Sequence, residues 1–217
     1  MALVIAVASL KGGTGKSTIA INLAACLHNN KHRVLIVDAD SQGTCRGWAS
    51  IAAAADRDTP PVVSMGSELR RDLAKVSGGF DVVVLDSPPR LGSEQRAAML
   101  VADLVLMPVT PGPADVWALQ ETLTLLADAR ELRPEIKAAI VMNRVNSRTS
   151  LAGVTHDALA SSGIPTLKTT LGSRVAYGEA LATGQGVGTY APGSAAAIEV
   201  EALAQESLAL LKGATEP

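Results

Sequence analysis

A short apolar run that ends in a glycine-rich turn is the feature that most constrains how this chain can fold. Residues 3–9 read LVIAVAS, and residues 10–18 read LKGGTGKST. The glycines of the second stretch allow the backbone to curl, so that its N–H groups can face an anion at the start of a helix. A strand, a glycine-rich turn and a helix in this order indicate a phosphate-binding loop. The alternative is a glycine-rich turn that binds no ligand.

The polar residues of this loop suggest how it would hold a polyphosphate. Lys16 would neutralise the β- and γ-phosphates, and the hydroxyl of Ser17 would be a ligand of Mg²⁺. We therefore predict a nucleotide site whose contacting residues are Lys11, Gly12, Gly13, Thr14, Gly15, Lys16, Ser17 and Thr18.

Short β-branched runs alternate with longer segments of helical spacing along the rest of the chain. The predicted strands cover residues 3–9, 33–38, 80–86, 104–109 and 136–143. Several are apolar on both faces, as buried parallel strands are. This alternation predicts an α/β fold with an open, mostly parallel sheet and helices on both faces. Because we find neither an internal repeat nor a low-complexity linker, we expect residues 1–217 to form a single domain.

Composition argues against several classes of function. The net charge of −2 and the aromatic content of 2% are unlike a protein that coats nucleic acid by bulk charge or stacks bases on aromatic platforms. Cys26 and Cys45 lack Cys-x-x-Cys spacing, which argues against a disulfide framework and against a zinc or iron–sulfur site. The first residues lack the basic segment of a signal peptide, and no apolar run reaches the ~20 residues of a membrane-spanning helix. We expect a reduced, cytoplasmic location.

Acidic residues follow two of the predicted strands. Asp38 and Asp40 come after an apolar run, and a period of two places both on the same side of an extended backbone. Asp86 ends a second apolar run, over residues 80–85. Phosphoryl transfer to water needs mainly a positioned water molecule and neutralised charge, and acids beside a phosphate loop suit that task. A different interpretation of Asp40 is that it caps a helix over residues 43–53.

Three segments of the chain resemble the ParA/MinD superfamily of P-loop ATPases. Residues 11–17 match its deviant Walker A signature, Lys-Gly-Gly-x-x-Lys-Ser/Thr. Residues 38–42 are similar to its Asp-x-Asp-Pro-Gln segment, with Ser41 in place of proline, and residues 86–89 have its Asp-x-Pro-Pro form. The resemblance implies a P-loop ATPase that uses ATP and Mg²⁺. The exchange at Ser41 can alter the turn and, with it, the rate of hydrolysis.

The resemblance also implies a catalytic set made of Lys11, Lys16 and Asp40. Lys11 would cross a dimer interface and touch the phosphates bound by a second copy of the chain, while Asp40 would orient the attacking water. Two faces that each carry bound phosphates would repel each other, and a cation at this position would reduce that repulsion. The alternative for Lys11 is a solvated loop lysine.

The same resemblance implies the metal and base contacts. Asp86 and Ser17 would hold Mg²⁺, and Asp38 would be either a further member of the magnesium site or a structural partner. Asn143, at the end of a predicted strand, resembles the asparagine with which the superfamily contacts adenine. Asparagine at a strand end is also an ordinary turn residue, so this role depends on the resemblance.

A proline-rich run narrows the branch of the superfamily. Residues 107–115 contain Pro-x-x-Pro-x-Pro-x-Asp, which is similar to small plasmid-partition ATPases of the ParF kind and to McdA-type carboxysome positioners. The implied function is partition of a plasmid or chromosome. An ATP-bound homodimer would bind nucleoid DNA without sequence preference, and a ParB/ParG-like partner would stimulate hydrolysis. The alternative is positioning of a protein cargo through an adaptor, such as a carboxysome, a chemoreceptor cluster or a conjugation complex.

Non-specific DNA binding requires cations that contact phosphates. The predicted contacts are Arg174, Lys168 and Arg148, with Arg174 the best match to the superfamily. Each of them alone is more simply a solvated surface charge. Further basic residues considered for this surface are Arg130, Arg133, Lys137 and Arg144.

Three other functions fit the residues less well. A membrane-binding relative needs a basic amphipathic tail, whereas residues 195–212 carry mainly acidic polar groups, so no membrane partner is expected. A metal-cluster carrier or nitrogenase-type reductase needs paired cysteines, which Cys26 and Cys45 do not provide. A small-molecule ligase such as a dethiobiotin synthetase would share the loop, but the Lys11 signature belongs to the dimer-forming branch.

Asp40→Ala should trap the ATP-bound dimer, because the variant lacks the group that orients the attacking water. Size-exclusion chromatography with Mg·ATP would show a persistent larger species. Hydrolysis of ATP by Asp40→Ala at the wild-type rate would show that the assignment of Asp40 is wrong.

Overall fold

The computed structural model describes residues 2–146 and 151–213, and within these ranges seven strands form one sheet. Their order across the sheet is β3-β2-β4-β1-β5-β6-β7, and each neighbouring pair is parallel. The strands are β1 (Leu3–Val7), β2 (Val34–Asp38), β3 (Val62–Ser64), β4 (Val82–Asp86), β5 (Leu104–Val109), β6 (Lys137–Val145) and β7 (Thr166–Gly172). The predicted α/β fold with a parallel sheet is confirmed.

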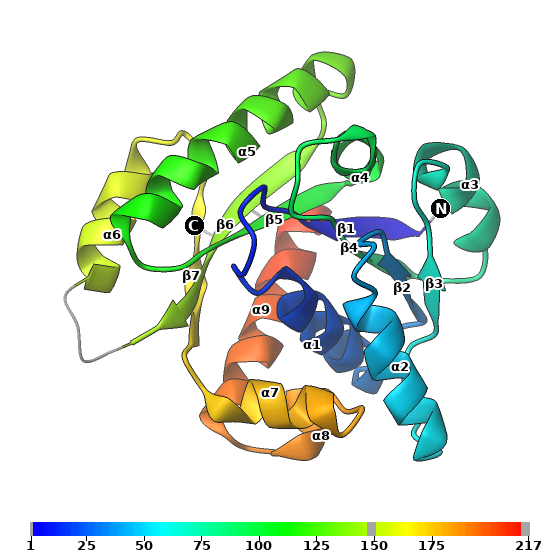
Figure 1. Ribbon diagram of the computed structural model, residues 1–217. Helices are drawn as coiled ribbons and strands as arrows, with labels where there is room; N and C mark the ends of the chain where they lie inside the picture. The colour runs from blue at the N-terminus through cyan, green and yellow to red at the C-terminus, as the bar shows by residue number, and fades with distance from the viewer. Residues whose placement is uncertain (1, 147–150, 214–217) are drawn as a thin grey trace.

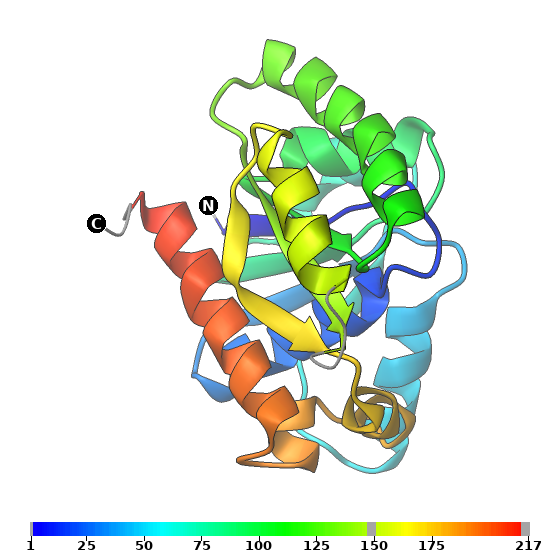
Figure 2. The same cartoon turned by 90° about the vertical axis from the view of Figure 1, so that its left-hand side faces the viewer.

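Helices cover both faces of this sheet (Figure 1, Figure 2). They are α1 (Lys16–Asn29), α2 (Thr44–Ala54), α3 (Leu69–Val76), α4 (Ser93–Val101), α5 (Pro113–Leu132), α6 (Leu151–Ala160), α7 (Val175–Ala182), α8 (Val187–Tyr190) and α9 (Ala195–Lys212). Residues of α3, α4, α5 and α6 share a buried cluster with one face of the sheet, and residues of α1, α2 and α9 share a second cluster with the other face. Parts of α7, α8 and α9 enclose a smaller third cluster.

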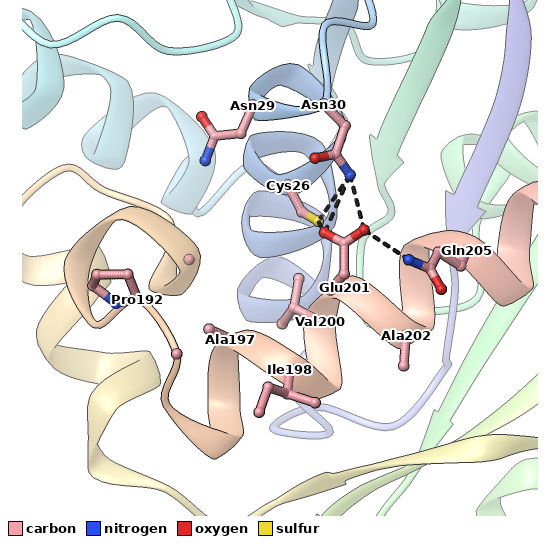
Figure 3. A pocket seen from close by; sticks show the side chains of 12 residues that line it. Cys26, Asn29, Asn30, Pro192, Ala197, Ile198, Val200, Glu201, Ala202 and Gln205 are labelled. Carbon is pink, nitrogen blue, oxygen red and sulfur yellow. Dashed lines mark hydrogen bonds between the residues drawn. The ribbon is translucent and has the colours of Figure 1, made fainter.

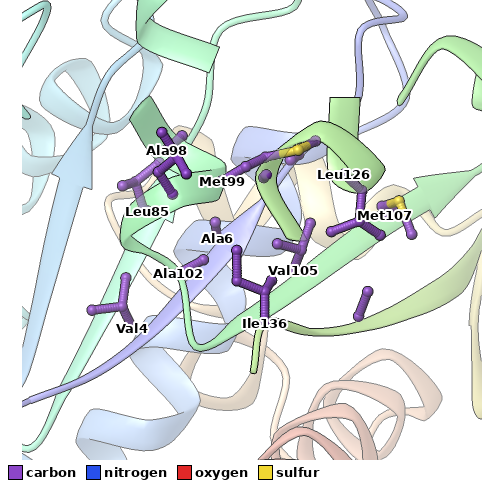
Figure 4. Packing of buried hydrophobic residues seen from close by; sticks show 14 of the residues in the cluster. Val4, Ala6, Leu85, Ala98, Met99, Ala102, Val105, Met107, Leu126 and Ile136 are labelled. Carbon is purple, nitrogen blue, oxygen red and sulfur yellow. The ribbon is translucent and has the colours of Figure 1, made fainter. Parts of the chain in front are cut away.

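The central strand β1 shows why the apolar runs are continuous. Val4 and Ala6 belong to the cluster with α4 and α5, which Figure 4 shows from close by. Ile5 and Val7 point the other way, into the cluster with α1 and α9. Complete burial of an aliphatic side chain of this size contributes ~1.5–3 kcal/mol. Apolar residues at consecutive positions therefore hold β1 in the middle of the molecule, with the loop that follows it anchored to the core.

The sequence pattern does not predict β3 and β7, which are the two edge strands of the sheet. β3 has three residues, none of them fully buried, and β7 carries polar residues between its two buried leucines. An edge strand has a neighbour on one side only, so it lacks the continuous apolar run that marks a central strand. The predicted strands differ from the observed ones by at most two residues at either end.

The order of the strands brings together the carboxyl ends of β1, β2 and β4, where the glycine-rich loop and two acids lie. The connection after β1 leads to β2 on one side of β1, whereas the connection after β4 leads to β5 on the other side. Ligands of open parallel sheets bind beyond the carboxyl ends of the strands at such a reversal. In the register of the sheet, Val7 pairs with Asp86, and Asp86 pairs with Asp38. The glycine-rich loop after β1 and both acids therefore share one edge.

Residues 195–212, whose polar groups are mainly acidic, form helix α9. Its amino end is capped by Ser194, whose side chain accepts a hydrogen bond from the amide of Ala197 at 3.2 Å. Its carboxyl end is followed by Gly213 in the left-handed conformation. None of the helices within the described ranges has the length and hydropathy needed to cross a bilayer.

Candidate functional site

The loop between β1 and α1 has the backbone that the glycine spacing predicts. Gly13 and Gly15 have φ values of 77° and 92°, in the left-handed region that favours glycine. A Cβ atom on Gly15 would also lie 2.3 Å from Nδ2 of Asn143, so a larger residue does not fit without a shift. A Cβ atom on Gly12, by contrast, would meet nothing within 4 Å in the described structure. No side chain in the described residues caps α1 at Lys16, which leaves the amides of its first turn for an anion.

Lys16 is buried inside this loop and is 6% exposed. Its Nζ donates to the carbonyl oxygen of Lys11 at 3.2 Å. Burial lowers the pKa of the Lys16 ammonium group, while the nearby carboxylates of Asp86 and Asp40 act in the opposite direction. The loop therefore holds a poorly hydrated cation beside acids, where a polyphosphate with its metal ion would complete the charge balance.

Asp38 and Asp86 end adjacent strands and are 1% and 0% exposed. Both oxygens of Asp38 accept from backbone amides, Oδ1 from Asp40 at 3.2 Å and Oδ2 from Arg46 at 3.1 Å. Oδ2 of Asp86 accepts from the thiol of Cys45 at 3.4 Å, whereas its Oδ1 has no hydrogen-bond partner among the described residues. A buried acceptor left without a partner is costly, so this oxygen marks a place for a ligand.

Burial shifts the pKa values of both acids upward. For Asp86, burial and the charge of Asp38 raise the pKa to about 6, against the influence of the Ser17 hydroxyl and the Cys45 thiol. Burial also raises the pKa of Asp38, despite the amide hydrogen bonds that favour its charged form. Ser17 thus lies beside Asp86, and the structure brings together the three residues predicted to hold a magnesium ion.

Asp40 lies half-buried in the turn after β2. Its Oδ1 accepts from the amide of Gln42 at 3.0 Å, and its carbonyl oxygen accepts from the amide of Gly43 at 3.0 Å. Helix α2 begins after Gly43, so the interpretation of Asp40 as the cap of that helix is wrong. The turn closes with Ser41 at the position where the superfamily has proline, which shows that proline is not required to form it.

A cleft of about 400 Å³ opens beside the two acids of this turn. Asp38 and Asp40 line it on one side, together with Arg46 from α2, and Arg90 and Leu91 line it from the loop after β4. Sequence reasoning missed both arginines, because neither belongs to a recognised motif. Their position after strands that end in acids is the signal that could have drawn attention to them.

Lys11 is held by α5 in this structure. Its Nζ forms an ion pair with Oδ2 of Asp115 at 2.9 Å, and the two side chains are 34% and 15% exposed. The preceding amide, that of Leu10, donates to Oγ1 of Thr122 at 3.2 Å, and the Leu10 side chain packs against the core. Lys11 is therefore a partly exposed loop lysine that is paired within its own chain, and its contact with a second copy stays a prediction. Asp115 belongs to the proline-rich run noted in the sequence. Its contact with Lys11 could not be predicted, because no local sequence pattern connects two residues so far apart in the chain.

Asn143 lies directly against the phosphate loop and is 7% exposed. Its Nδ2 donates to the carbonyl oxygen of Thr14 at 2.7 Å, and its Oδ1 accepts from the amide of Arg144 at 2.9 Å. The nitrogen and the oxygen of its side-chain amide therefore both form hydrogen bonds with the backbone, and the nitrogen connects β6 to the phosphate loop. Contact of Asn143 with adenine stays a prediction.

The basic residues considered for DNA binding do not form one cluster: some lie near the amino ends of the strands and others on or after β6 and β7. Arg130, Arg133 and Lys137 lie near the amino ends of the strands, where they bind acids or backbone carbonyls. Lys168 and Arg144 are exposed on β7 and β6, Arg174 follows β7, and Arg148 lies outside the described residues. DNA binding by any of them stays a prediction.

Arg174 is engaged by an acid at the edge of the sheet. Its Nε donates to Oε1 of Glu199 at 2.9 Å, and the Arg174 side chain is 40% exposed. Burial alone would raise the pKa of Glu199, but hydrogen bonds from Arg174, the Gly172 amide and Tyr177 hold it below its usual value. The charge of Arg174 is thus partly neutralised within the chain.

Comparison with known proteins agrees with this geometry. Residues 5–187 match the family described as the CobQ/CobB/MinD/ParA nucleotide binding domain. "Maintenance of carboxysome distribution protein A" from Halothiobacillus neapolitanus is 34% identical over 94% of this chain and 96% of its own length. The "Chromosome-partitioning ATPase Soj" from Thermus thermophilus is 31% identical over 97% of each chain.

Solved structures share the fold. The cell division ATPase MinD from Pyrococcus furiosus superposes with a TM-score of 0.77 at 21% identity, covering 97% of this chain and 100% of its own. MinD from Pyrococcus horikoshii, solved with Mg-ADP, gives a TM-score of 0.76 at 20% identity and covers 100% of both chains. At these identities the likeness shows the fold alone.

Asp86→Asn should stabilise the nucleotide-free protein at neutral and higher pH. A carboxyl group whose pKa is raised to about 6 in the folded chain adds stability below its unfolded value of 3.8, and this stability is lost as the pH rises through 6. Above that pH the ionised Asp86 is disfavoured in the fold, and an amide should raise the free energy of unfolding by about 1–3 kcal/mol.

Urea denaturation without Mg²⁺, at about pH 5 and about pH 8, measures this difference. The advantage of Asp86→Asn over wild type is expected to grow toward the higher pH. An effect of equal size at both pH values would contradict the pKa shift of Asp86.

Proposed function

Because the chain belongs to the CobQ/CobB/MinD/ParA nucleotide-binding family, we propose that it is an ATPase that dimerises with ATP and positions a cargo over the nucleoid. One observation carries this proposal above the others. A loop with two lysines, Lys11 and Lys16, lies at the reversal point of the sheet beside the acids Asp38, Asp40 and Asp86. In this proposal Lys16 binds the phosphates of its own site, and Lys11 contacts the phosphates bound by the second copy of the chain.

The residues present fit a magnesium ion together with ATP. Ser17, Asp38 and Asp86 offer the hard oxygen ligands that Mg²⁺ prefers, and Oδ1 of Asp86 is buried without a partner in the described structure. When bound, the ion neutralises charge on the β- and γ-phosphates. Lys16 would bind the same phosphates, together with the amides of the first turn of α1.

Asp40 is the residue that positions the attacking water in this proposal. Its turn is fixed by the hydrogen bonds to Gln42 and Gly43, and its carboxylate stays half-buried at the edge of a cleft. A water molecule held there would be aligned by a group that does not need to move. Such alignment is the main contribution that a protein makes to phosphoryl transfer.

The comparisons favour a protein cargo over a DNA-borne one. Sequence reasoning placed plasmid or chromosome partition first, with protein cargo as the alternative. Two carboxysome distribution proteins resemble this chain, one at 34% identity over 94% of it and one at 43% over 55%. We therefore infer that an adaptor protein of a protein assembly stimulates hydrolysis, and that the ATP-bound dimer associates with the nucleoid in the cytoplasm. The similarity to Soj supports chromosome segregation as the second candidate.

Lys11→Ala should retain nucleotide binding but abolish the ATP-dependent dimer and, with it, stimulated hydrolysis. Sedimentation at micromolar protein with saturating Mg·ATP, in an Asp40→Ala background, is the measurement. Single chains in the Asp40→Ala protein with intact Lys11 would refute the proposed function.

Asp115→Asn provides the matched variant, since it releases Lys11 without removing it. A partly exposed ion pair is worth ~0.2–1 kcal/mol, so dimerisation should strengthen by up to about fivefold per protomer. Weaker dimerisation of Asp115→Asn would show that the Lys11–Asp115 contact supports the dimer instead of restraining it.

Arg174→Glu should weaken ATP-dependent binding to DNA without changing dimerisation, because it replaces a phosphate-contacting cation by an anion. A gel-shift assay with ATP over a series of salt concentrations measures the loss. Arg174→Lys keeps the charge and should bind nearly as well as wild type. Equal binding by wild type and Arg174→Glu would remove Arg174 from the DNA site.

A further inference from the structure

The acids of the site enclose a thiol that the proposed ATPase chemistry does not use. Cys45, in the first turn of α2, is 0% exposed. One donor atom each from Asp38, Cys45 and Asp86 lies within 4.8 Å of the other two, and all three residues are buried. The thiol donates to Oδ2 of Asp86 at 3.4 Å, while Oδ1 of the same carboxylate lacks a partner among the described residues.

These separations suit a small tetrahedral cation. Zinc binds sulfur at about 2.3 Å and carboxylate oxygen at about 2.0–2.2 Å, so its ligand atoms lie roughly 3.3–3.8 Å apart. The Cys45–Asp86 pair already has that spacing, and closing a pair of ligand atoms from the 4.8 Å limit of the cluster requires a change of at most about 1.5 Å. A water molecule would take the fourth position, as it does in zinc sites with three protein ligands.

We propose that Asp38, Cys45 and Asp86 form a site for a thiolate-binding divalent cation, zinc foremost, that fills in the absence of nucleotide. On binding, the Cys45 sulfur exchanges its proton for the metal, and the proton leaves to solvent. Two carboxylates and one thiolate then face the cation and the nearby ammonium group of Lys16, which leaves the cluster close to neutral.

This site differs from the magnesium site of the proposed function. Mg²⁺ avoids sulfur ligands, keeps several water molecules and is bound largely through the phosphates of its nucleotide. The thiol-containing site needs no phosphate. Because both sites use Asp38 and Asp86, zinc would compete with Mg·ATP, and this consequence rests on the proposed function.

The second cysteine of the chain provides an internal control. Cys26 lies on α1, where its Sγ donates to Oε2 of Glu201 on α9 at 3.1 Å, as Figure 3 shows. Burial and the Glu201 carboxylate raise the pKa of Cys26 to about 12. Only one acid approaches this thiol in the described structure, so Cys26 falls outside the cluster of metal-binding groups. Cys26→Ser should leave the proposed site intact.

Titration of the nucleotide-free protein with Co²⁺ tests the proposal directly, since a cobalt–thiolate bond has a charge-transfer absorption that carboxylate ligands lack. Wild type and Cys26→Ser should bind one equivalent with this band, and Zn²⁺ should displace it. Cys45→Ser should lose the band and bind zinc at least ~10-fold more weakly in equilibrium dialysis. Cobalt binding without the band, or equal zinc affinity of wild type and Cys45→Ser, would overturn the proposal.

A second experiment tests whether zinc at this site competes with Mg·ATP. Zinc should inhibit ATP hydrolysis by wild type and Cys26→Ser at concentrations at least ~10-fold lower than those needed for Cys45→Ser. Equal inhibition of all three proteins would overturn the competition. If the protein proves not to bind ATP at all, the cobalt spectrum still decides whether the metal site exists, so the two proposals fail separately.

Discussion

Burial of charge at the carboxyl edge of the sheet is the constraint on which the rest of the structure depends. Lys16, Asp38 and Asp86 are 6%, 1% and 0% exposed. A charged group removed from water costs several kcal/mol unless other groups compensate it. Backbone amides of the turn and of α2 compensate Asp38, and a loop carbonyl compensates Lys16. Asp86 keeps one oxygen without a partner in the described structure, which is costly to bury and would be compensated by the proposed cation.

The loop that carries Lys16 is held in place by elements far from it in the chain. Asn143 binds the carbonyl oxygen of Thr14, and Thr122 binds the amide of Leu10. Asp115 binds the Lys11 side chain from the first turn of α5, where the helix dipole also favours an acid. The lysine proposed to serve a second copy is thus paired within its own chain. In the proposed dimer it would exchange this carboxylate partner for a phosphate.

The fold alone does not decide what this edge of the sheet binds. The same architecture occurs in solved MinD proteins and in a cobyrinic acid a,c-diamide synthase from Mycobacterium smegmatis. Proteins with one fold differ through the side chains placed at a shared site. In this chain the thiol of Cys45 lies among the acids. A thiolate ligand favours softer cations than carboxylates do, which is the basis of the proposed zinc site.

The sequence by itself determined the features that depend on neighbouring residues. Glycine spacing predicted the loop before Lys16, continuous apolar runs predicted the central strands, and acids after those runs predicted Asp38 and Asp86 at one edge. Only the tertiary structure decided which distant side chains meet there. Asp115 with Lys11, and Cys45 with Asp86, come from separate elements that the strand order brings together, and the polar edge strand β7 becomes a strand through its pairing with β6. Local sequence patterns specify backbone conformation. Contacts between distant residues depend on the order of the strands and on how the crossover connections pack, and neither can be predicted from a local pattern.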